Sequence, residues 1–360
     1  MRQRSRSRAA VILGLGVGWG VIGCQGALPG DGPSAPFRSG VLIDAPVDAV
    51  ALGSDDSGIY WTSGANELWV LRTGATMPEC LAAGPPPPAT CNQATAPVLA
   101  STQVFWAPAD RASIHRTRKD GGGDEIVAQT TRAEIAIDTD DVYWTDVTGP
   151  FGEGSGVVLS LPLDAAPGST PAKRVQVSSS DEVTAIAVFD GALYWSDTEI
   201  VGTTVDYADL GWGPLDSLDG IWHGRAVNLP GNSRRLDVAG GNVYAASEDG
   251  MYVTSLVRLS STGEAQTIGT LPGQRGTQNV VVLGNWALVS VVSTDDCPQP
   301  SSLDLAAIPV GGGDPRPVVT GMHTAAVAMG PGIVFVDASN RLVAMSPSDV
   351  DQAIMGPDQP

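Results

Sequence analysis

The sequence predicts an all-β protein built from seven similar four-stranded sheets, and three observations support this prediction. The 360 residues include 44 Gly and 27 Pro, which interrupt long helices and suit short strands joined by turns. A unit consisting of an apolar strand, an Asp/Gly/Asn turn and an aromatic strand recurs along the chain. The copies lie about 45 residues apart, which is the size of one four-stranded repeat.

The repeats can be aligned on one aromatic or large apolar position. It is occupied by Tyr60, Phe105, Tyr143, Tyr194, Tyr244, Leu288 and Phe335. A single small sheet cannot bury both of its faces, whereas sheets stacked radially cover one another. The repeats therefore predict one β-propeller domain at residues 41–346. Consecutive strand residues face opposite sides, so we expect each Tyr-Trp pair to form core between blades.

Ring closure is predicted at the N-terminal end of the repeats. After Arg341–Met345 the chain offers no convincing fourth strand, because residues 346–360 are rich in Pro and Asp. The apolar segment Val41–Ile43, in contrast, precedes the first repeat. We expect it to complete the last blade and leave no free sheet edge at the seam. Residues 347–360 are expected to form a C-terminal tail.

Two of the repeats carry a recognisable motif. The residues Tyr143-Trp144-Thr145-Asp146 and Tyr194-Trp195-Ser196-Asp197 resemble the YWTD repeat of low-density-lipoprotein-receptor-type propellers. Ser63 and Ser247 stand where that motif has Asp. The receptor propellers have six blades, so six blades remain an alternative to seven. We expect Asp146 and Asp197 to accept hydrogen bonds from backbone amides.

The first residues predict an address in the cell envelope. Met1–Arg8 carries four Arg, and the following Ala9–Gly23 is uncharged and mostly apolar. The residues Val21-Ile22-Gly23-Cys24 resemble the lipobox of bacterial lipoproteins. That resemblance implies a signal peptide at 1–23, acylation of Cys24, a flexible tether at 24–40 and, with Gln25 next, the outer membrane. The sequence does not indicate whether the protein faces the periplasm or the cell surface. The alternative is a secretory signal in which Cys24 is incidental.

Charge and cysteine spacing limit the partners. A formal net charge of −19 repels phosphate backbones, so we expect no nucleic acid and a membrane contact by lipid only. Lys119 and Lys173 are the only lysines among 20 basic residues, which we attribute to coding bias. Cys80 and Cys91 bracket a Pro-rich loop that a disulfide could close, leaving Cys297 over. We expect a monomer.

Few residues suggest catalysis. His115, His223 and His323 are scattered, no CxxC spacing is present, and no metal site can be assigned. We expect His115 to face outward from a third strand, and His323 to be the one candidate catalytic residue. A channel histidine with metal-bridged carboxylates would resemble the streptogramin lyases. Calcium at the turns Asp138–Asp141 or Asp120–Asp124 is a weaker expectation, since turn chemistry explains both.

Insertions predict a recognition surface. We interpret Asp146–Gly156, Asp197–Gly220 and Ser293–Ser302 as long loops opening on one face, with Ile221-Trp222 as the third strand of the fourth repeat. The candidate binding residues in these loops are Tyr207, Asp209, Trp212, Asp216, Asp219, Asp295 and Asp296. The first hypothesis is a lipid-anchored binding or scaffold module for a protein or saccharide. The alternatives are a hydrolase or lyase with a metal-assisted site near His323, and a structural coat component.

Overall fold

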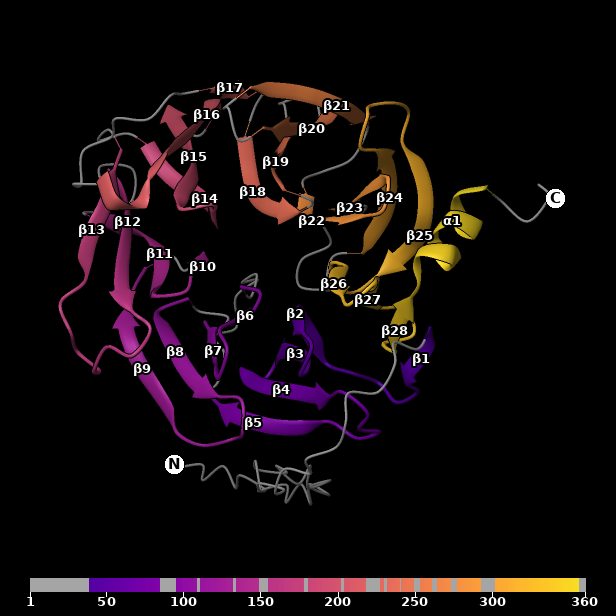
Figure 1. The fold of residues 1–360 in the computed structure, drawn as a ribbon, viewed down its shortest axis with the longest axis horizontal. Coiled ribbons are helices and arrows are strands. Elements are labelled where there is room, and N and C mark those ends of the chain that lie inside the picture. Colours follow the sequence, from indigo (N-terminus) through magenta and orange to yellow (C-terminus); the bar gives the residue numbers. More distant parts are fainter. Residues whose placement is uncertain are drawn as a thin grey trace, which may run out of the picture.

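The computed structural model shows a ring of seven sheets (Figure 1). It describes residues 39–355 except 85–94, 109–110, 132–133, 149–154, 178–180, 202–203, 218–226, 230–231, 240, 249–252, 261–263, 273–276 and 293–301. Each sheet has four antiparallel strands, and the first strand of each blade lies nearest the axis of the ring. The seven-bladed β-propeller predicted from the repeats is therefore confirmed.

In each of the first four blades the strands pair in chain order. From the axis outward they consist of β2 (Ala49–Asp55), β3 (Gly58–Ser63), β4 (Glu67–Arg72), β5 (Glu79–Ala83); β6 (Val98–Leu99), β7 (Gln103–Trp106), β8 (Ser113–Arg118), β9 (Asp124–Gln129); β10 (Ile135–Ile137), β11 (Asp141–Thr148), β12 (Ser155–Pro162), β13 (Ala172–Gln176); and β14 (Asp181–Phe189), β15 (Ala192–Val201), β16 (Thr204–Pro214), β17 (Val227–Leu229).

The remaining three blades complete the ring. They consist of β18 (Asn232–Ala239), β19 (Asn242–Glu248), β20 (Val253–Leu259), β21 (Ala265–Pro272); β22 (Thr277–Leu283), β23 (Trp286–Val292), β24 (Leu303–Pro309), β25 (Arg316–Met322); and β26 (Val327–Met329), β27 (Gly332–Val336), β28 (Leu342–Met345), β1 (Gly40–Ile43). Two short helices lie outside the sheets, η1 (Leu215–Ser217) and α1 (Pro347–Met355).

The N-terminal strand closes the ring as predicted. β1 is the outermost strand of blade seven and pairs with β28, with Gly40 opposite Ala344 and Ile43 opposite Leu342. The backbone amide of Val47 then donates to the carbonyl of Asn340 at 2.7 Å and holds the connection to blade one. Both ends of the propeller therefore meet in one blade, which leaves no break in the ring between blades seven and one.

The core is divided into one apolar cluster at each seam between blades. Tyr60 shares a cluster with Trp106 of the next blade, Phe105 with Trp144, and Tyr143 with Trp195. The aromatic at the aligned position thus faces the following blade, and its neighbour in sequence faces the preceding one. This confirms that the Tyr-Trp pairs are core. In blade seven the aligned residue is Val334, opposite Val327, and not Phe335.

The third strand of blade four corrects one prediction. It is β16, which pairs with β15 from Pro214 opposite Ala192 to Thr204 opposite Val201. Most of the predicted loop Asp197–Gly220 is therefore strand, and Ile221-Trp222 lies outside the described residues. The glycine that made β16 resemble a loop has a packing reason. A Cβ at Gly211 would lie 2.3 Å from Cε2 of Trp195, so the indole needs a residue without a side chain opposite it.

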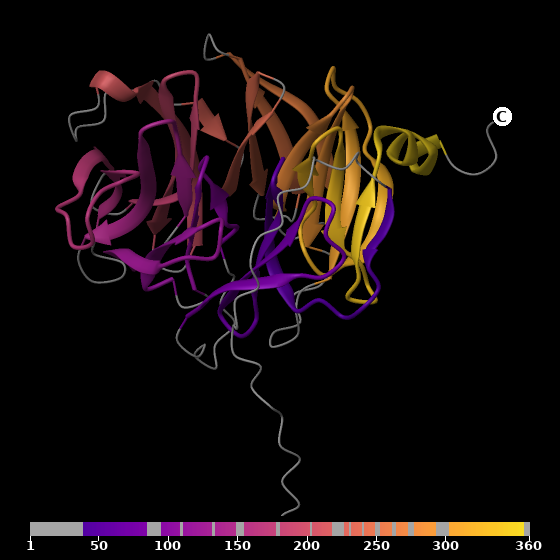
Figure 2. The same ribbon diagram turned by 60° about the horizontal axis from the view of Figure 1, so that its bottom comes forward.

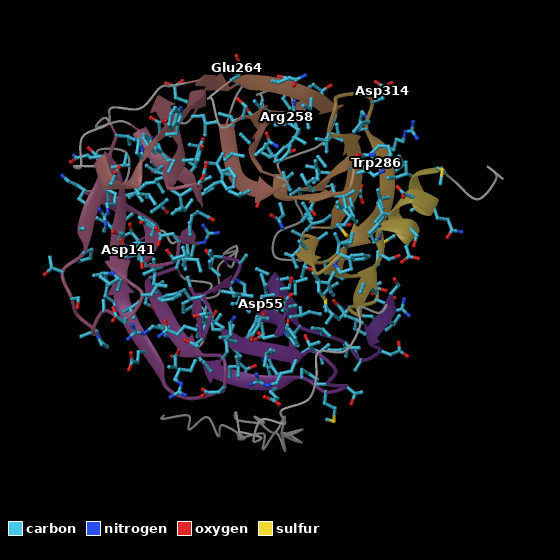
Figure 3. All side chains as sticks on the ribbon, in the orientation of Figure 1. Asp55, Asp141, Arg258, Glu264, Trp286 and Asp314 are labelled. Atoms are coloured by element: carbon cyan, nitrogen blue, oxygen red, sulfur yellow. The ribbon has the colours of Figure 1, made fainter. Side chains whose placement is uncertain are left out.

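The segment expected to be a tail begins with a helix. The Ser346 amide donates to Oδ2 of Asp349 at 2.7 Å, and the Asp349 amide donates back to Oγ of Ser346 at 3.3 Å. This is a capping box, with Pro347 at the first helical position. Val350 is fully buried against blades six and seven, and the indole of Trp286 donates to Asp351 at 3.0 Å (Figure 3). Among the described residues, no helix is both long and apolar enough to cross a membrane.

Arginines connect neighbouring blades in a repeated way. Arg72, Arg116 and Arg258 each lie on a third strand and donate to a backbone carbonyl of the next blade. The acceptors, Lys119, Leu163 and Val310, are each the first residue after that blade's third strand. Each guanidinium also binds an acidic or amide side chain on the fourth strand of its own blade, namely Glu79, Glu125 and Gln266. Each of these arginines binds a backbone carbonyl and a side chain at once, which a lysine does poorly. For these three positions, coding bias is therefore not the whole explanation of arginine in place of lysine. Arg258 is labelled in Figure 3.

Candidate functional site

The antiparallel order of the strands gives the propeller two different faces, and Figure 2 shows the ring obliquely. We call the face with the connections between second and third strands the loop face. We call the opposite face, with the connections between first and second strands, the turn face. The sequence predicts recognition at the loop face, so the position of each candidate residue relative to these faces decides whether it can contribute.

Blade four places acidic residues together at its loop-face end. Asp197 of β15 is directly opposite Asp209 of β16, and Glu199 of β15 is opposite Asp181 of β14 and Tyr207 of β16. Asp197 and Glu199 are two residues apart in β15, so the two rows are neighbouring register positions of the hairpin. Two of the predicted binding residues, Tyr207 and Asp209, therefore belong to one acidic end of blade four, and Asp181 and Glu199 join them there.

Trp212 and Asp216 lie elsewhere. The ring of Trp212 stacks on Tyr194 at 6.3 Å between centroids and packs against the seam with blade five. Asp216 is exposed in η1, where the amide of Leu215 donates to the carbonyl of Gly191 in a turn-face connection. Because β16 runs from the loop face to the turn face, these two residues lie away from Asp209, and the predicted single surface is corrected. Asp219, Asp295 and Asp296 lie outside the described residues.

Other acidic residues serve the fold. One carboxylate oxygen of Asp146 accepts from the amides of Thr131 and Val147 at 3.0 and 2.8 Å, as the motif predicts. Asp138 accepts from the amides of Asp140 and Asp141 and from the hydroxyl of Tyr143 at 2.9 Å. Burial first, and then the Asp138 carboxylate, raise the pKa of Tyr143. Both oxygens of Asp138 thus accept hydrogen bonds from the protein, as expected for an aspartate that stabilises a turn.

His323 lies where the chain crosses from β25 to β26. Its backbone amide donates to the carbonyl of Val336 at 2.9 Å. The ring Nδ1 is buried and has no hydrogen-bond partner in the described part of the chain. Within the same described residues, no three His, Cys, Asp or Glu side chains lie together as a set that could hold a metal ion. The structure therefore adds no second residue to the catalytic hypothesis at His323.

Blade two contains a hydrogen-bonded chain that the sequence analysis missed. Oγ of Ser113 lies 3.0 Å from Nε2 of His115, and Nδ1 of His115 lies 2.8 Å from Oδ2 of Asp124. The other oxygen of Asp124 accepts from Thr117 at 2.7 Å, and Thr117 accepts from the indole of Trp106 at 3.0 Å. His115 is 3% exposed and its ring lies 4.7 Å from that of Trp106, so the prediction that it faces outward is wrong.

The order Ser–His–Asp is that of an acyl-transfer triad, but in this protein the three residues form a buried hydrogen-bonded network that stabilises blade two. Ser113 is 7% exposed and His115 is covered by Trp106, whereas a nucleophile must be reached by its substrate. Burial alone would raise the pKa of the Asp124 carboxyl, yet hydrogen bonds from His115 and Thr117 hold it below its ordinary value. A signal existed in the sequence: Ser113, His115 and Thr117 alternate on one face of a strand next to a Trp-bearing strand.

The remaining candidates fall mostly outside the described residues. Cys24, Cys91, Cys297 and His223 are among them, so acylation of Cys24 and the Cys80–Cys91 disulfide stay predictions. Cys80 lies half-buried in β5.

Comparisons with known proteins show the fold and no closer relationship. No family model and no curated protein matches this chain. Three solved structures share the architecture. YCF48 bound to a D1 peptide has a TM-score of 0.54 at 9% identity, over 87% of this chain and 99% of that one. A prolyl endopeptidase has a TM-score of 0.54 at 15% identity, over 83% of this chain and 47% of that one. An oligogalacturonate lyase from Vibrio parahaemolyticus has a TM-score of 0.53 at 7% identity, over 85% of this chain and 90% of that one. The chain is a seven-bladed β-propeller, a fold that carries both binding and catalytic proteins.

Proposed function

We propose that this chain is a lipid-anchored cell-envelope propeller that binds a protein or saccharide at its loop face. The observation that carries the proposal is the acidic end of blade four, where Asp181, Asp197, Glu199 and Asp209 lie in two adjacent cross-strand rows. A group of carboxylates of one sign favours a cationic or hydrogen-bonding partner through electrostatic complementarity.

Two further features support a binding role. The seams between blades are packed with buried aromatic and aliphatic residues, which gives a rigid frame for residues at the rim. Similar propellers include one solved with a bound D1 peptide and one named as an oligogalacturonate lyase, which supports considering both a protein and a saccharide partner. The predicted anchor at Cys24 would hold such a module at the membrane surface.

Site-specific photo-cross-linking tests this function. A benzophenone amino acid replaces Tyr207 at the loop face or Asn285, which is exposed in the turn-face connection of blade six. Irradiation of cells producing the full chain is expected to yield a cross-linked protein from position 207 and none from position 285. A saccharide partner would instead appear on a glycan array and disappear with D197N/D209N. No product at 207 and no glycan signal would overturn the proposal.

A further inference from the structure

The strand β1 has few contacts of its own in blade seven. In blades one to six the fourth strand follows the third along the chain, whereas β1 precedes the whole ring and is not joined to β28 by a short connection. Gly40 and Val41 are exposed, and Ile43 is the one buried residue of the strand. The pairing with β28 also shifts register between Val41 and Ile43. A short strand near a chain end stays ordered when other contacts tie it down, so the neighbours of β1 matter.

The helix α1 supplies a contact directly before β1. The hydroxyl of Ser39 donates a hydrogen bond to the carboxylate of Asp349, which lies in the first turn of α1. The same carboxylate accepts from the hydroxyl of Ser346 at 2.6 Å and from its amide at 2.7 Å. The bonds from Ser346, and then that from Ser39, hold the pKa of Asp349 below its ordinary value, so the carboxylate is ionised at neutral pH. One side chain thus joins the segment that enters β1 to the segment that leaves β28.

The helix is itself fixed to two blades. α1 lies against β25 of blade six and β28 of blade seven, and Figure 1 shows it outside β25. Val350 is fully buried in the apolar cluster that these blades share. Asp351 accepts from the indole of Trp286 at 3.0 Å, and the guanidinium of Arg316 lies 5.6 Å from the centre of that ring. The helix therefore connects blade six to the place where the two ends of the ring meet.

We propose that α1 is a latch that holds β1 in blade seven through Asp349, and that undocking of α1 releases β1 and opens the ring at the outer edge of β28. Cleavage of the chain between β28 and α1, or a partner that captures the helix, would undock it. Release would leave β26, β27 and β28 paired and expose the backbone groups of β28 that β1 covers. The latch is independent of the partner of the loop face. If Cys24 is acylated as predicted, β1 is also the strand at which the tether enters the propeller.

Hydrogen–deuterium exchange of the full chain in detergent, read by mass spectrometry on peptides that cover β1, tests the latch. Val350→Asp places a charge at a fully buried position of α1 and leaves the sequence of β1 unchanged. A second variant ends the chain after Ser346 and so removes the helix without adding a buried charge. In both variants we expect the amides of β1 to exchange about tenfold faster or more, whereas peptides of β3 and β7 keep the rates of the parent.

A matched pair of serine variants tests the bond that makes the latch. Ser39→Ala removes the hydroxyl that donates to Asp349. Ser348→Ala is the control, because it makes the same substitution in the first turn of α1, where the Ser348 hydroxyl lies 2.8 Å from that of Ser346. We expect exchange of the β1 amides to become about fivefold faster in Ser39→Ala and to stay at the parental rate in Ser348→Ala.

Three results would overturn the inference. Parental exchange of β1 in both α1 variants would mean that β1 stays paired without the helix. Equal acceleration in β1, β3 and β7 would mean that α1 stabilises the whole propeller and does not act on β1. Equal rates in Ser39→Ala and Ser348→Ala would mean that Asp349 does not hold the strand. None of these results bears on the cross-link at position 207, so failure of the latch and failure of the proposed function are distinguishable.

Discussion

The seam between blades one and two differs from the seam between blades three and four, although the same repeat position forms both. In the first, Trp106 of β7 is opposite His115 and its indole donates to Thr117. In the second, Trp195 of β15 is opposite Gly211, and its buried indole nitrogen has no partner in the described residues. In the first seam a hydrogen-bonded network within blade two holds the tryptophan, whereas in the second the indole packs closely against Gly211.

The difference shows that the third strand, not the aromatic strand, decides how a seam is held. The residue opposite the tryptophan is Trp69 in blade one, His115 in blade two, Leu159 in blade three and Gly211 in blade four. Each solution buries the indole, and the Trp106 N–H has a partner, whereas the buried indole nitrogens of Trp144 and Trp195 have none in the part of the chain that the structure describes. Because a buried donor without a partner costs free energy, the apolar seams depend on tight packing to offset it.

The packed seam should be broken most severely by filling Gly211. In Gly211→Ala, the new Cβ would lie 2.3 Å from the indole of Trp195, which is fully buried and has no room to move. We expect a loss of about 3 kcal/mol in unfolding free energy, measured by denaturant titration. Gly311→Ala is the control, because a Cβ there meets nothing within 4 Å, and it should change stability by less than about 0.5 kcal/mol. Equal effects would contradict this account of the seam.

The polar seam should be sensitive to one hydroxyl. Thr117→Val keeps the volume but removes the hydroxyl that accepts from the Trp106 indole and donates to Asp124. We expect a loss of about 2 kcal/mol, read from the shift of the denaturation midpoint. Thr254→Val is the matched control, since the Thr254 hydroxyl is buried with no partner among the described residues and its removal should be neutral or stabilising. A stabilising Thr117→Val would show that the network contributes nothing.

The two seams also differ in how far sequence could predict them. The repeated Tyr-Trp pair predicts which residues enter each seam, because alternation in a strand sends one residue to each side. The partner of each tryptophan depends on strand register, which one sequence does not reveal when the third strand contains Gly211 and Gly213. The two glycines favour a loop over a strand at β16 in the sequence, and without the register of β8 the sequence does not show that His115 lies opposite Trp106.

The sequence predicts only part of the candidate site, again because strand register cannot be read from it. Tyr207 and Asp209 do belong to the acidic end of blade four, since clustered acids with no basic residue are visible in composition. A loop would allow Trp212 and Asp216 to lie beside Tyr207 and Asp209. In the extended strand β16, Trp212 and the following Asp216 lie toward the opposite face of the propeller. The short pairing of β17 with Ala208–Leu210 could not be predicted from the sequence either, because it depends on strand register.

The arginine that crosses the polar seam should have a smaller effect. Nη2 of Arg72 donates to the carbonyl of Lys119 at 2.7 Å, and its Nε donates to Glu79 at 3.0 Å. Arg72→Lys can satisfy one of these groups and not both, so we expect a loss of about 1 kcal/mol by thermal melting. Arg118→Lys is the control, because Arg118 is paired with Asp120 at the exposed surface and should be near neutral. A larger loss in the control would contradict the bridging role.

The smallest effect should be a dependence of the polar seam on pH. The pKa of Asp124 is lower in the folded protein than its ordinary value, so ionised Asp124 stabilises the fold above the unfolded pKa, about 4. That stabilisation is lost as the pH falls through the lower, folded value. Melting temperatures of Asp124→Asn and the parent should therefore differ at pH 7 and converge below pH 4. Asp314→Asn, which alters an exposed carboxylate, should give no such convergence. A constant difference for Asp124→Asn at every pH would mean that its hydrogen bonds stabilise the seam through shape and not through charge.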